Sequence, residues 1–298
     1  MFCKTIKKSI EFTGIGLHKG KPVKVKLAPL FEKKIVFFKQ DMGISIELNP
    51  FNIVDTTLAT VIGKNNAVIS TIEHLMSAIY AFGIDGLRII VDGDEIPIMD
   101  GSSFPFVMLL KEASFEFFSE KKEILKIIKP IEVRDGDKFV KVEPSSKLIF
   151  DYTIEFAHPL IKKQSYSFEF STVKYINEIS RARTFGFLKD IQYLKNKGLI
   201  QGGNLDNAVV LTNNGILNDH LRYKDEFVRH KILDAIGDLS QLNSIFLGKY
   251  TAFKGSHKLN NLLCKKIIAE KAYEVITDTN SLPAFYFNKV FSLNFLTS

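Results

Sequence analysis

The chain has 298 residues, of which 46% are hydrophobic and 24% are charged, a composition typical of a folded globular protein. This length is sufficient for two ordinary domains or one large domain, and the composition excludes a disordered or fibrous chain. Lys and Arg (40) outnumber Asp and Glu (33), which gives a formal net charge of +7. Because the positive residues are spread along the chain, we expect anionic small-molecule partners and no nucleic-acid binding.

The cysteines and the apolar stretches indicate the compartment. Cys3 and Cys264 are far apart and fit no disulfide or metal-ligand spacing, and no secretory signal precedes the first strand pattern. The apolar stretch 84–91 is interrupted by Asp85 and Arg88 and is far too short to span a bilayer. We therefore expect a cytoplasmic protein without a transmembrane segment.

The first half of the chain predicts strands followed by two helices. Val23, Val25 and Leu27 alternate with lysines, as in a half-buried strand, and further strands are expected at 35–38, 44–48 and 87–91. The stretches 58–62 and 67–70 are expected to be strands on either side of a hairpin turn at 63–66. A helix is expected over 71–82, before the stop at Gly83, and a second over 105–112 with Ser102 or Ser103 as its cap.

The second half repeats this order of elements. A run of strands is expected to begin at Ile124 and to continue at 139–142, 147–155 and 166–170. A helix over 225–242, a strand over 245–253 and a helix after Gly255-Ser256 follow. Each half has a histidine on a helix followed by a Gly-Ser turn. The sequence therefore predicts an α+β fold of two similar β-α-α-β sandwich domains, 1–122 and 123–298, that arose by internal duplication, with the active site between them.

One helical motif is suited to metal binding. His230 and Asp234 are four residues apart, so they lie on one helix face about one turn from each other, and Asp238 continues that face. The opposite face is apolar and would anchor the helix. Two ligands of one divalent cation fit this spacing, and so does a His–Asp ion pair on a solvated helix.

Glu73-His74 is the second candidate pair. His74 could supply a third metal ligand, because a catalytic zinc site keeps three protein ligands, and Glu73 could take a proton from water. However, Ser70 and Glu73 also match the capping-box pattern, in which both side chains only satisfy the helix N-terminus.

His257 is the third candidate. At the start of the last helix it could donate a proton to a leaving amine if a carboxylate such as Asp238 raised its pKa, or it could merely help to cap the helix. His18 lies in a glycine-rich turn, 14–20, that resembles a dinucleotide loop only superficially. His158 and His220 are expected to be solvated.

Several long motifs together resemble one family. The stretches 70–75, 95–102, 180–186 and 230–238, with Gly14 to His18 and His257, are similar to the UDP-3-O-acyl-N-acetylglucosamine deacetylases, bacterial enzymes that commit the pathway to lipid A. The resemblance spans about residues 5–285. It implies hydrolysis of the acetamide of the acylated UDP-sugar to UDP-3-O-acyl-glucosamine and acetate. Ala59 replaces a cysteine that many members have, at a position without a catalytic role.

The resemblance also implies a role for each site residue. The zinc ligands fall on His74, His230 and Asp234, the general base on Glu73 and the general acid on His257. Asp238 orients that histidine, Thr184 assists the oxyanion, and Lys231 lies near the substrate. The same ligand set tolerates iron(II).

The resemblance places an apolar acyl channel in an insertion at about 187–205. Phe187, Ile191, Ile200 and Leu205 belong to its apolar set, which surrounds a short helix ended by Gly198. Lys231 and Lys254 would suit the diphosphate. We expect a monomer.

Two other functions compete with this one. A hydrolase of the same fold could act on a different N-acyl sugar, and a basic binding protein could hold zinc structurally, although a structural site needs four ligands.

Overall fold

Two five-stranded sheets with the same strand order form the outer parts of the molecule. The computed structural model describes residues 1–277, so residues 278–298 of the predicted second domain lie outside the described part. The first sheet has the order β2-β3-β9-β4-β5, with bounds Ile10–Ile15, Pro22–Pro29, Leu87–Asp92, Ile35–Lys39 and Ile44–Glu47. The second has the order β12-β13-β19-β14-β15, with bounds Ile131–Asp135, Lys138–Glu143, Lys249–Phe253, Ile149–Glu155 and Lys163–Glu169.

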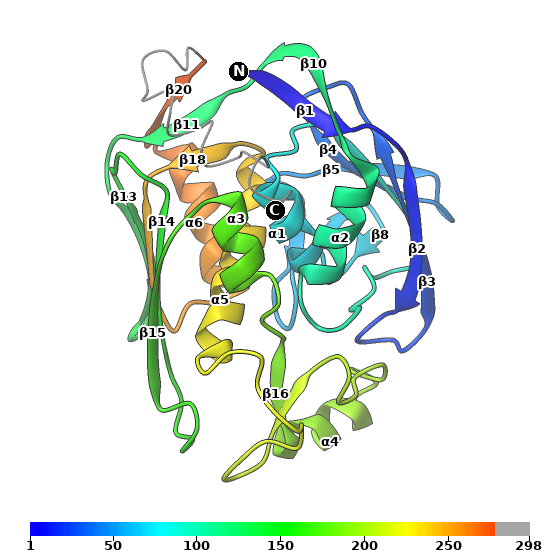
Figure 1. Cartoon of the computed structure of the whole chain (residues 1–298), viewed down its shortest axis with the longest axis vertical. Coiled ribbons are helices and arrows are strands. Elements are labelled where there is room, and N and C mark those ends of the chain that lie inside the picture. The colour runs from blue at the N-terminus through cyan, green and yellow to red at the C-terminus, as the bar shows by residue number, and fades with distance from the viewer. Residues whose placement is uncertain (278–298) are drawn as a thin grey trace.

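The directions of the strands also match between the two sheets. In each sheet the third and fourth strands pair in parallel, β9 with β4 and β19 with β14, and the other neighbours are antiparallel. Figure 1 shows helices between the two sheets: α1 (Glu73–Ala81), α2 (Phe104–Ala113), α5 (Glu226–Leu239) and α6 (His257–Ala269). The fold is thus α+β, as predicted.

Smaller sheets complete the described chain. β1 (Phe2–Ile6) pairs with β10 (Phe115–Lys121), and β11 (Ile124–Ile127) lies between β18 (Ile245–Leu247) and β20 (Tyr273–Ile276). β6 (Ile53–Asp55), β7 (Val61–Lys64) and β8 (Ala67–Ile69) form a third small sheet. β16 (Phe185–Phe187) pairs with β17 (Val209–Leu211), and α4 (Leu188–Asn196) follows β16. Short helical turns occupy Pro50–Asn52, Thr172–Lys174, Tyr175–Ile179 and Ser240–Leu242.

Hydrophobic periodicity accounts for most of these elements. In β9, Leu87, Ile89 and Val91 are fully buried while their neighbours are not, which is the alternation expected of a strand with one face on the core. In α5 the apolar face that includes Val228, Ile232 and Ala235 is also fully buried. The core therefore lies on the inner faces of both sheets and around the helices between them.

Three sequence-based expectations need correction. The stretch 245–253 is not one strand, because it passes at Gly248 from β18 in a small sheet to β19 in the second large sheet. Residues 58–60 are irregular, and the strand begins only at Val61. Of the two expected caps of α2, Ser103 occupies the N-cap position but its hydroxyl donates to the carbonyl oxygen of His74 (2.8 Å), whereas the Ser102 hydroxyl accepts from the amide of Phe104, the first residue of the helix (3.2 Å).

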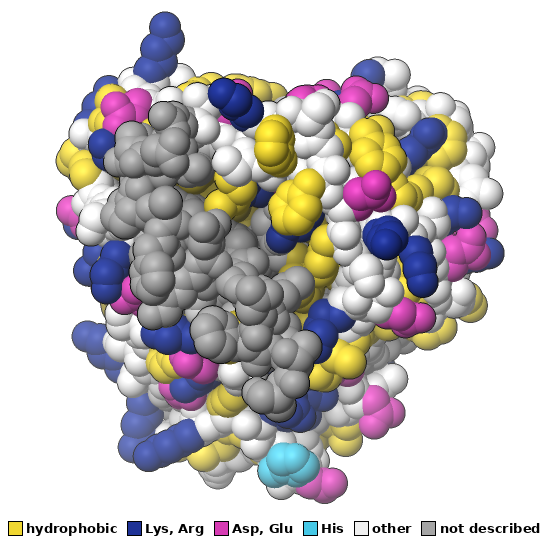
Figure 2. Space-filling view, turned by 45° about the horizontal axis from the view of Figure 1, so that its top comes forward, with side chains coloured by type: hydrophobic (Ala, Val, Ile, Leu, Met, Phe, Trp, Pro, Cys, Tyr) yellow, Lys and Arg dark blue, Asp and Glu magenta, His cyan; other side chains and the backbone are white. Residues whose placement is uncertain are grey.

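The surface carries mixed charge. Figure 2 shows Lys and Arg side chains scattered among Asp and Glu side chains, with hydrophobic side chains between them, on the face that it draws. Phe2 and Phe117, on the paired strands β1 and β10, are among the exposed hydrophobic residues. Within residues 1–277, no helix is long and apolar enough to cross a membrane.

The helices α1 and α5, one from each half of the chain, pack closely against each other. A Cβ atom added at Gly237 of α5 would lie 2.1 Å from the carbonyl oxygen of Glu73 on α1, so this glycine lets the two helix backbones come into contact. His74 on α1 thereby faces His230 and Asp234 on α5.

We expect Gly237→Ala to lower the free energy of unfolding by about 1–3 kcal/mol, because the added methyl group overpacks a rigid backbone contact. Thermal or denaturant unfolding measures this loss. Gly186→Ala is the matched control, since a Cβ there meets no atom within 4 Å. Equal stability of the two variants would contradict the inferred helix contact.

Candidate functional site

Three buried side chains converge where α1 meets α5. His74 Nε2 lies 3.5 Å from Asp234 Oδ1, and His230 Nε2 lies 3.3 Å from the same oxygen. One ligand atom from each of these residues lies within 4.8 Å of the other two. The helical spacing of His230 and Asp234 supplies two of the three atoms, and the contact at Gly237 brings the third from the other half of the chain.

The environment prepares two of these groups, His230 and Asp234, to bind a cation. His230 Nδ1 lies 3.0 Å from the carbonyl oxygen of Ala182, so we assign the proton to Nδ1, which leaves a lone pair on Nε2. Burial lowers the pKa of His230 to about 3, which keeps the ring neutral. Burial tends to raise the pKa of Asp234, but the ammonium group of Lys231, 2.8 Å from Oδ2, holds it well below its usual range.

The donor set fits a divalent metal ion. Asp234 Oδ1 is buried and has no hydrogen-bond partner within residues 1–277, which is costly unless another group binds the oxygen. Two neutral imidazoles and one carboxylate are the ligands of catalytic zinc sites and of related transition-metal sites. His74, His230 and Asp234 could therefore hold such an ion.

Glu73 lies in this site and does not cap α1. Ile72 is at the N-cap position without a side-chain hydrogen bond, and the amide of Ser70 donates to the carbonyl oxygen of Asp94. The capping-box interpretation of Ser70 and Glu73 is therefore wrong. Glu73 Oε2 instead accepts a hydrogen bond from the amide of Thr60 (3.0 Å), and burial raises the pKa of the Glu73 carboxyl.

His257 pairs with Asp238. Its Nδ1 atom lies 2.8 Å from Asp238 Oδ2, and Asp238 is fully buried. Although burial opposes it, the Asp238 carboxylate raises the pKa of His257 to about 9, so the imidazole carries a proton at neutral pH. The alternative that His257 caps α6 is wrong, because the Ser256 hydroxyl accepts the capping hydrogen bond from the amide of Leu259.

Specific contacts also fix Thr184 and Lys231. The amide of Thr184 donates to the carbonyl oxygen of Gly101. Gly101 has a φ of +82°, and a Cβ added there would lie 2.0 Å from the carbonyl oxygen of Asn207. The predicted motif ending in Gly101-Ser102 therefore holds the loop that carries Thr184. Lys231 Nζ donates to Asp234 Oδ2 (2.8 Å).

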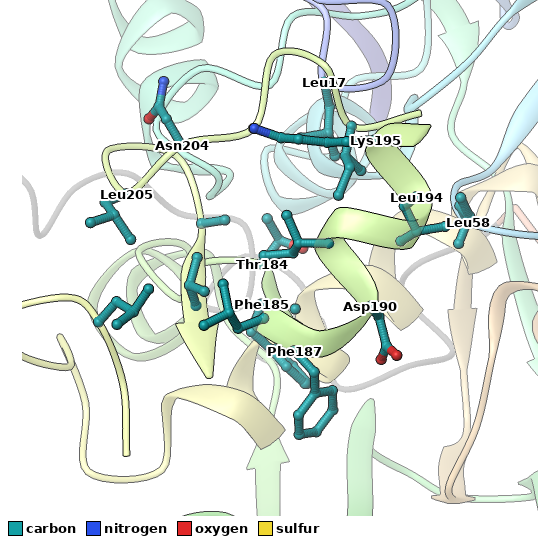
Figure 3. A pocket seen from close by; sticks show the side chains of 18 of the residues that line it. Leu17, Leu58, Thr184, Phe185, Phe187, Asp190, Leu194, Lys195, Asn204 and Leu205 are labelled. Atoms are coloured by element: carbon teal, nitrogen blue, oxygen red, sulfur yellow. The ribbon is translucent and has the colours of Figure 1, made fainter. Parts of the chain in front are cut away.

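A mostly apolar cavity of about 370 Å³ opens beside Thr184. Figure 3 shows α4 along one side, with Leu194, Phe187 and Leu205 around the space. The four residues predicted for an acyl channel all line it: Phe187, Ile191, Ile200 and Leu205. Gly198, with a φ of +75°, follows the end of α4 as expected.

Sequence reasoning missed the contribution of the first half to this cavity. Leu17, His18 and Leu58 line it together with the insertion. The glycine-rich turn 14–20 was the one sequence signal of this contribution. The turn packs against the insertion, where a Cβ added at Gly202 would lie 2.3 Å from the carbonyl oxygen of Gly16.

Two side chains lie where the sequence did not place them. Lys254 Nζ is paired with Asp137 (2.8 Å) and Glu155 (2.9 Å), and it does not line the cavity. His158 was expected to be solvated but is buried, with Nε2 2.8 Å from the oxygen of Thr212, whereas His220 is exposed as expected.

Comparison with known proteins matches almost the whole chain. A family described as UDP-3-O-acyl N-acetylglycosamine deacetylase matches residues 3–269. Proteins named UDP-3-O-acyl-N-acetylglucosamine deacetylase are 57% identical in Nautilia profundicola, over 92% of this chain and 94% of the relative, and 56% identical in Wolinella succinogenes, over 97% and 98%. One from Helicobacter pylori is 52% identical, over 97% and 99%.

We expect His230→Ala and Asp234→Ala each to abolish stoichiometric metal binding, because two protein ligands hold a divalent ion far more weakly than three. Elemental analysis of the purified, dialysed protein measures the metal content. His220→Ala, which removes an exposed histidine of the second half, should keep the metal. Full metal content in both ligand variants would refute the ligand assignment.

Proposed function

The chain belongs to the UDP-3-O-acyl N-acetylglycosamine deacetylase family, and on that premise we propose that it hydrolyses the acetamide of UDP-3-O-acyl-N-acetylglucosamine. The products would be UDP-3-O-acyl-glucosamine and acetate, in the committed step of lipid A biosynthesis. The observation that carries this proposal is the convergence of His74, His230 and Asp234 in a buried site. The site also contains Glu73, whose pKa is raised by burial, and His257, whose imidazole is protonated at neutral pH.

We propose Zn²⁺ as the cofactor, with Fe²⁺ as the alternative, held by His74, His230 and Asp234. When bound, such an ion supplies Lewis-acid chemistry, which polarises a carbonyl and lowers the pKa of water from about 15.7 toward roughly 7. Lys231, hydrogen-bonded to Asp234, helps to keep that ligand ionised.

The residues of the chain would then divide the proton transfers. Glu73 accepts a proton from the attacking water while the water oxygen forms a bond to the acetamide carbon. The Thr184 hydroxyl donates a hydrogen bond to the oxyanion that develops on the carbonyl oxygen. His257, held by Asp238, gives its proton to the sugar nitrogen as the carbon–nitrogen bond breaks, so that the leaving group departs as a neutral amine.

The cavity suits the acyl chain of this substrate. Its apolar lining, including Phe187, Ile191 and Leu205, would bury methylene groups at about 0.8 kcal/mol each. Lys231 remains our candidate for a contact with the diphosphate. Lys254 is a weaker one, because its ammonium group would have to leave Asp137 and Glu155.

The shared strand order of the two large sheets supports an origin by internal duplication. We propose two β-α-α-β sandwich domains, 1–122 and 123–298, with the site between them. A monomer in the cytoplasm stays a prediction.

Acetate release from acylated and non-acylated UDP-N-acetylglucosamine tests the function. We expect turnover of the acylated sugar nucleotide and a much lower kcat/KM for the other, because only the acyl chain fills the cavity. Equal rates would favour a hydrolase for a different N-acyl sugar, and no release from either would leave a non-enzymatic protein.

Glu73→Gln should keep the bound metal but reduce kcat by about 10²–10⁴-fold, since an amide cannot accept the proton of water. Metal analysis and steady-state kinetics on one preparation measure both effects. A variant with normal kcat would show that Glu73 has no role as a base.

Activity should fall as the pH rises through about 9, because His257 must carry a proton to act as an acid and its pKa is raised to about 9. His257→Ala should be slow at every pH and should lose this alkaline limb of the pH–rate profile. A limb that is unchanged in the variant would assign it to another group.

A further inference from the structure

Thr60 contacts Glu73, the proposed base, and Asp238, the carboxylate that holds the proposed acid His257, although nothing in the sequence marks it. It lies in the irregular stretch just before β7 and is 1% exposed. Its amide donates to Glu73 Oε2 (3.0 Å), and its hydroxyl donates to Asp238 Oδ1 (2.5 Å). One residue of the first half thus bridges the base of its own half and the carboxylate of the other.

The irregular backbone makes this bridge available. A residue inside a strand directs its amide at a neighbouring strand, but Thr60 precedes Val61, where β7 begins, and its amide is left for a side chain. The carbonyl oxygen of Thr60 accepts from the amide of Ile72, just before α1. The peptide of Thr60 is therefore fixed on both sides against the N-terminus of the helix that carries Glu73 and His74.

The hydroxyl completes the hydrogen bonding of Asp238. Oδ2 accepts from His257 Nδ1 (2.8 Å) and from Asn260 Nδ2 (2.8 Å), while Oδ1 accepts from Thr60. Asn260 is itself held by the hydroxyl of Tyr250 (2.7 Å). Donors on both oxygens determine the plane of the carboxylate, and that plane directs the imidazole of His257.

We propose that Thr60 is a positioning residue that fixes Glu73 and the Asp238–His257 pair relative to each other, so that proton acceptance and proton donation occur on opposite sides of one hydrogen-bonded unit. This inference rests on the proposed function for its catalytic meaning. Its geometric part, that the Thr60 hydroxyl controls the state of His257 through Asp238, does not depend on the substrate.

Thr60→Val is the informative variant, because it keeps the shape and the amide and removes only the hydroxyl. Without this donor, more of the negative charge of Asp238 remains to hold the proton on His257. We expect the pKa of His257 to rise above its value of about 9 in the parent, and kcat to fall about tenfold while KM stays unchanged. KM is the control readout, because Thr60 does not line the cavity.

Two measurements report on the variant. The pH dependence of the His257 imidazole signals in the NMR spectrum of the metal-free protein gives the pKa without any substrate, and the pH–rate profile gives kcat and its alkaline limb. The other titratable groups that act on His257 are Asp238 and Asp234 of α5 and Glu73 of α1, and all three are kept.

Matched variants separate positioning from general destabilisation. Thr60→Ser keeps the hydroxyl and should restore the parent pKa and most of kcat. Thr57→Val removes an exposed hydroxyl of the same loop, bonded to Asp55, and should change neither. If Thr60 acts through Asp238, Thr60→Val should have little further effect on kcat in an Asp238→Asn background.

The outcomes are distinct. A raised His257 pKa with rescue by serine supports the inference, even if the parent proves inactive on the acylated sugar nucleotide, which would reject the proposed function alone. An unchanged pKa and kcat in Thr60→Val, or the same changes in Thr60→Ser, would overturn the inference in an active enzyme. A lower melting temperature with an unmoved pH profile would also overturn it and leave Thr60 a purely structural residue.

Discussion

The contact between α1 and α5 is the constraint on which the site depends. His230 and Asp234 need only a helix to face the same way, but His74 comes from the other half of the chain and meets them only because Gly237 allows the backbone of α5 to touch that of α1. The same contact places the backbone of Glu73 against Gly237 of α5. Thr60 bonds to Glu73 and to Asp238 next to this contact. The glycine at position 237 thus permits the close packing of the two helices that carry the three ligands and Glu73.

This arrangement buries several charges, and it is stable only because each has a compensating partner. One carboxylate oxygen of Asp234 accepts a hydrogen bond from Lys231, and the other faces the imidazoles of His74 and His230. Both oxygens of Asp238 accept hydrogen bonds, one of them from His257. An uncompensated buried carboxylate would cost several kcal/mol or take up a proton. The burial that gives Glu73 its raised pKa and the pairing that keeps His257 protonated are therefore two results of the same packing.

Sequence reasoning predicted those parts of the fold that depend on local periodicity. The helices around residues 73–81 and 226–239 and the main strands follow from alternating or 3.6-residue patterns, and the helical spacing alone put His230 and Asp234 on one face. Sequence reasoning was wrong where the same residue spacing fits two different local structures. Ser70 and Glu73 have the spacing of a capping box, yet Thr71 takes a φ of +59° and the helix starts too late for Ser70 to cap it. The role of Thr60 could not be predicted, because a threonine before a strand shows no pattern until the other half of the chain is folded against it.

The glycine-rich turn 14–20 follows the same logic as Gly237. Its spacing resembles a dinucleotide loop only superficially. The glycines instead allow backbone contact with the insertion, where the amides of Gln201 and Gly202 donate to the carbonyl oxygens of His18 and Leu17. That contact closes one side of the cavity with Leu17 and His18. Both the buried site and the cavity are therefore made from residues of both halves, joined at glycines, so neither half alone carries a complete set of ligands or a closed apolar wall. This division explains why the site residues are scattered over most of the chain.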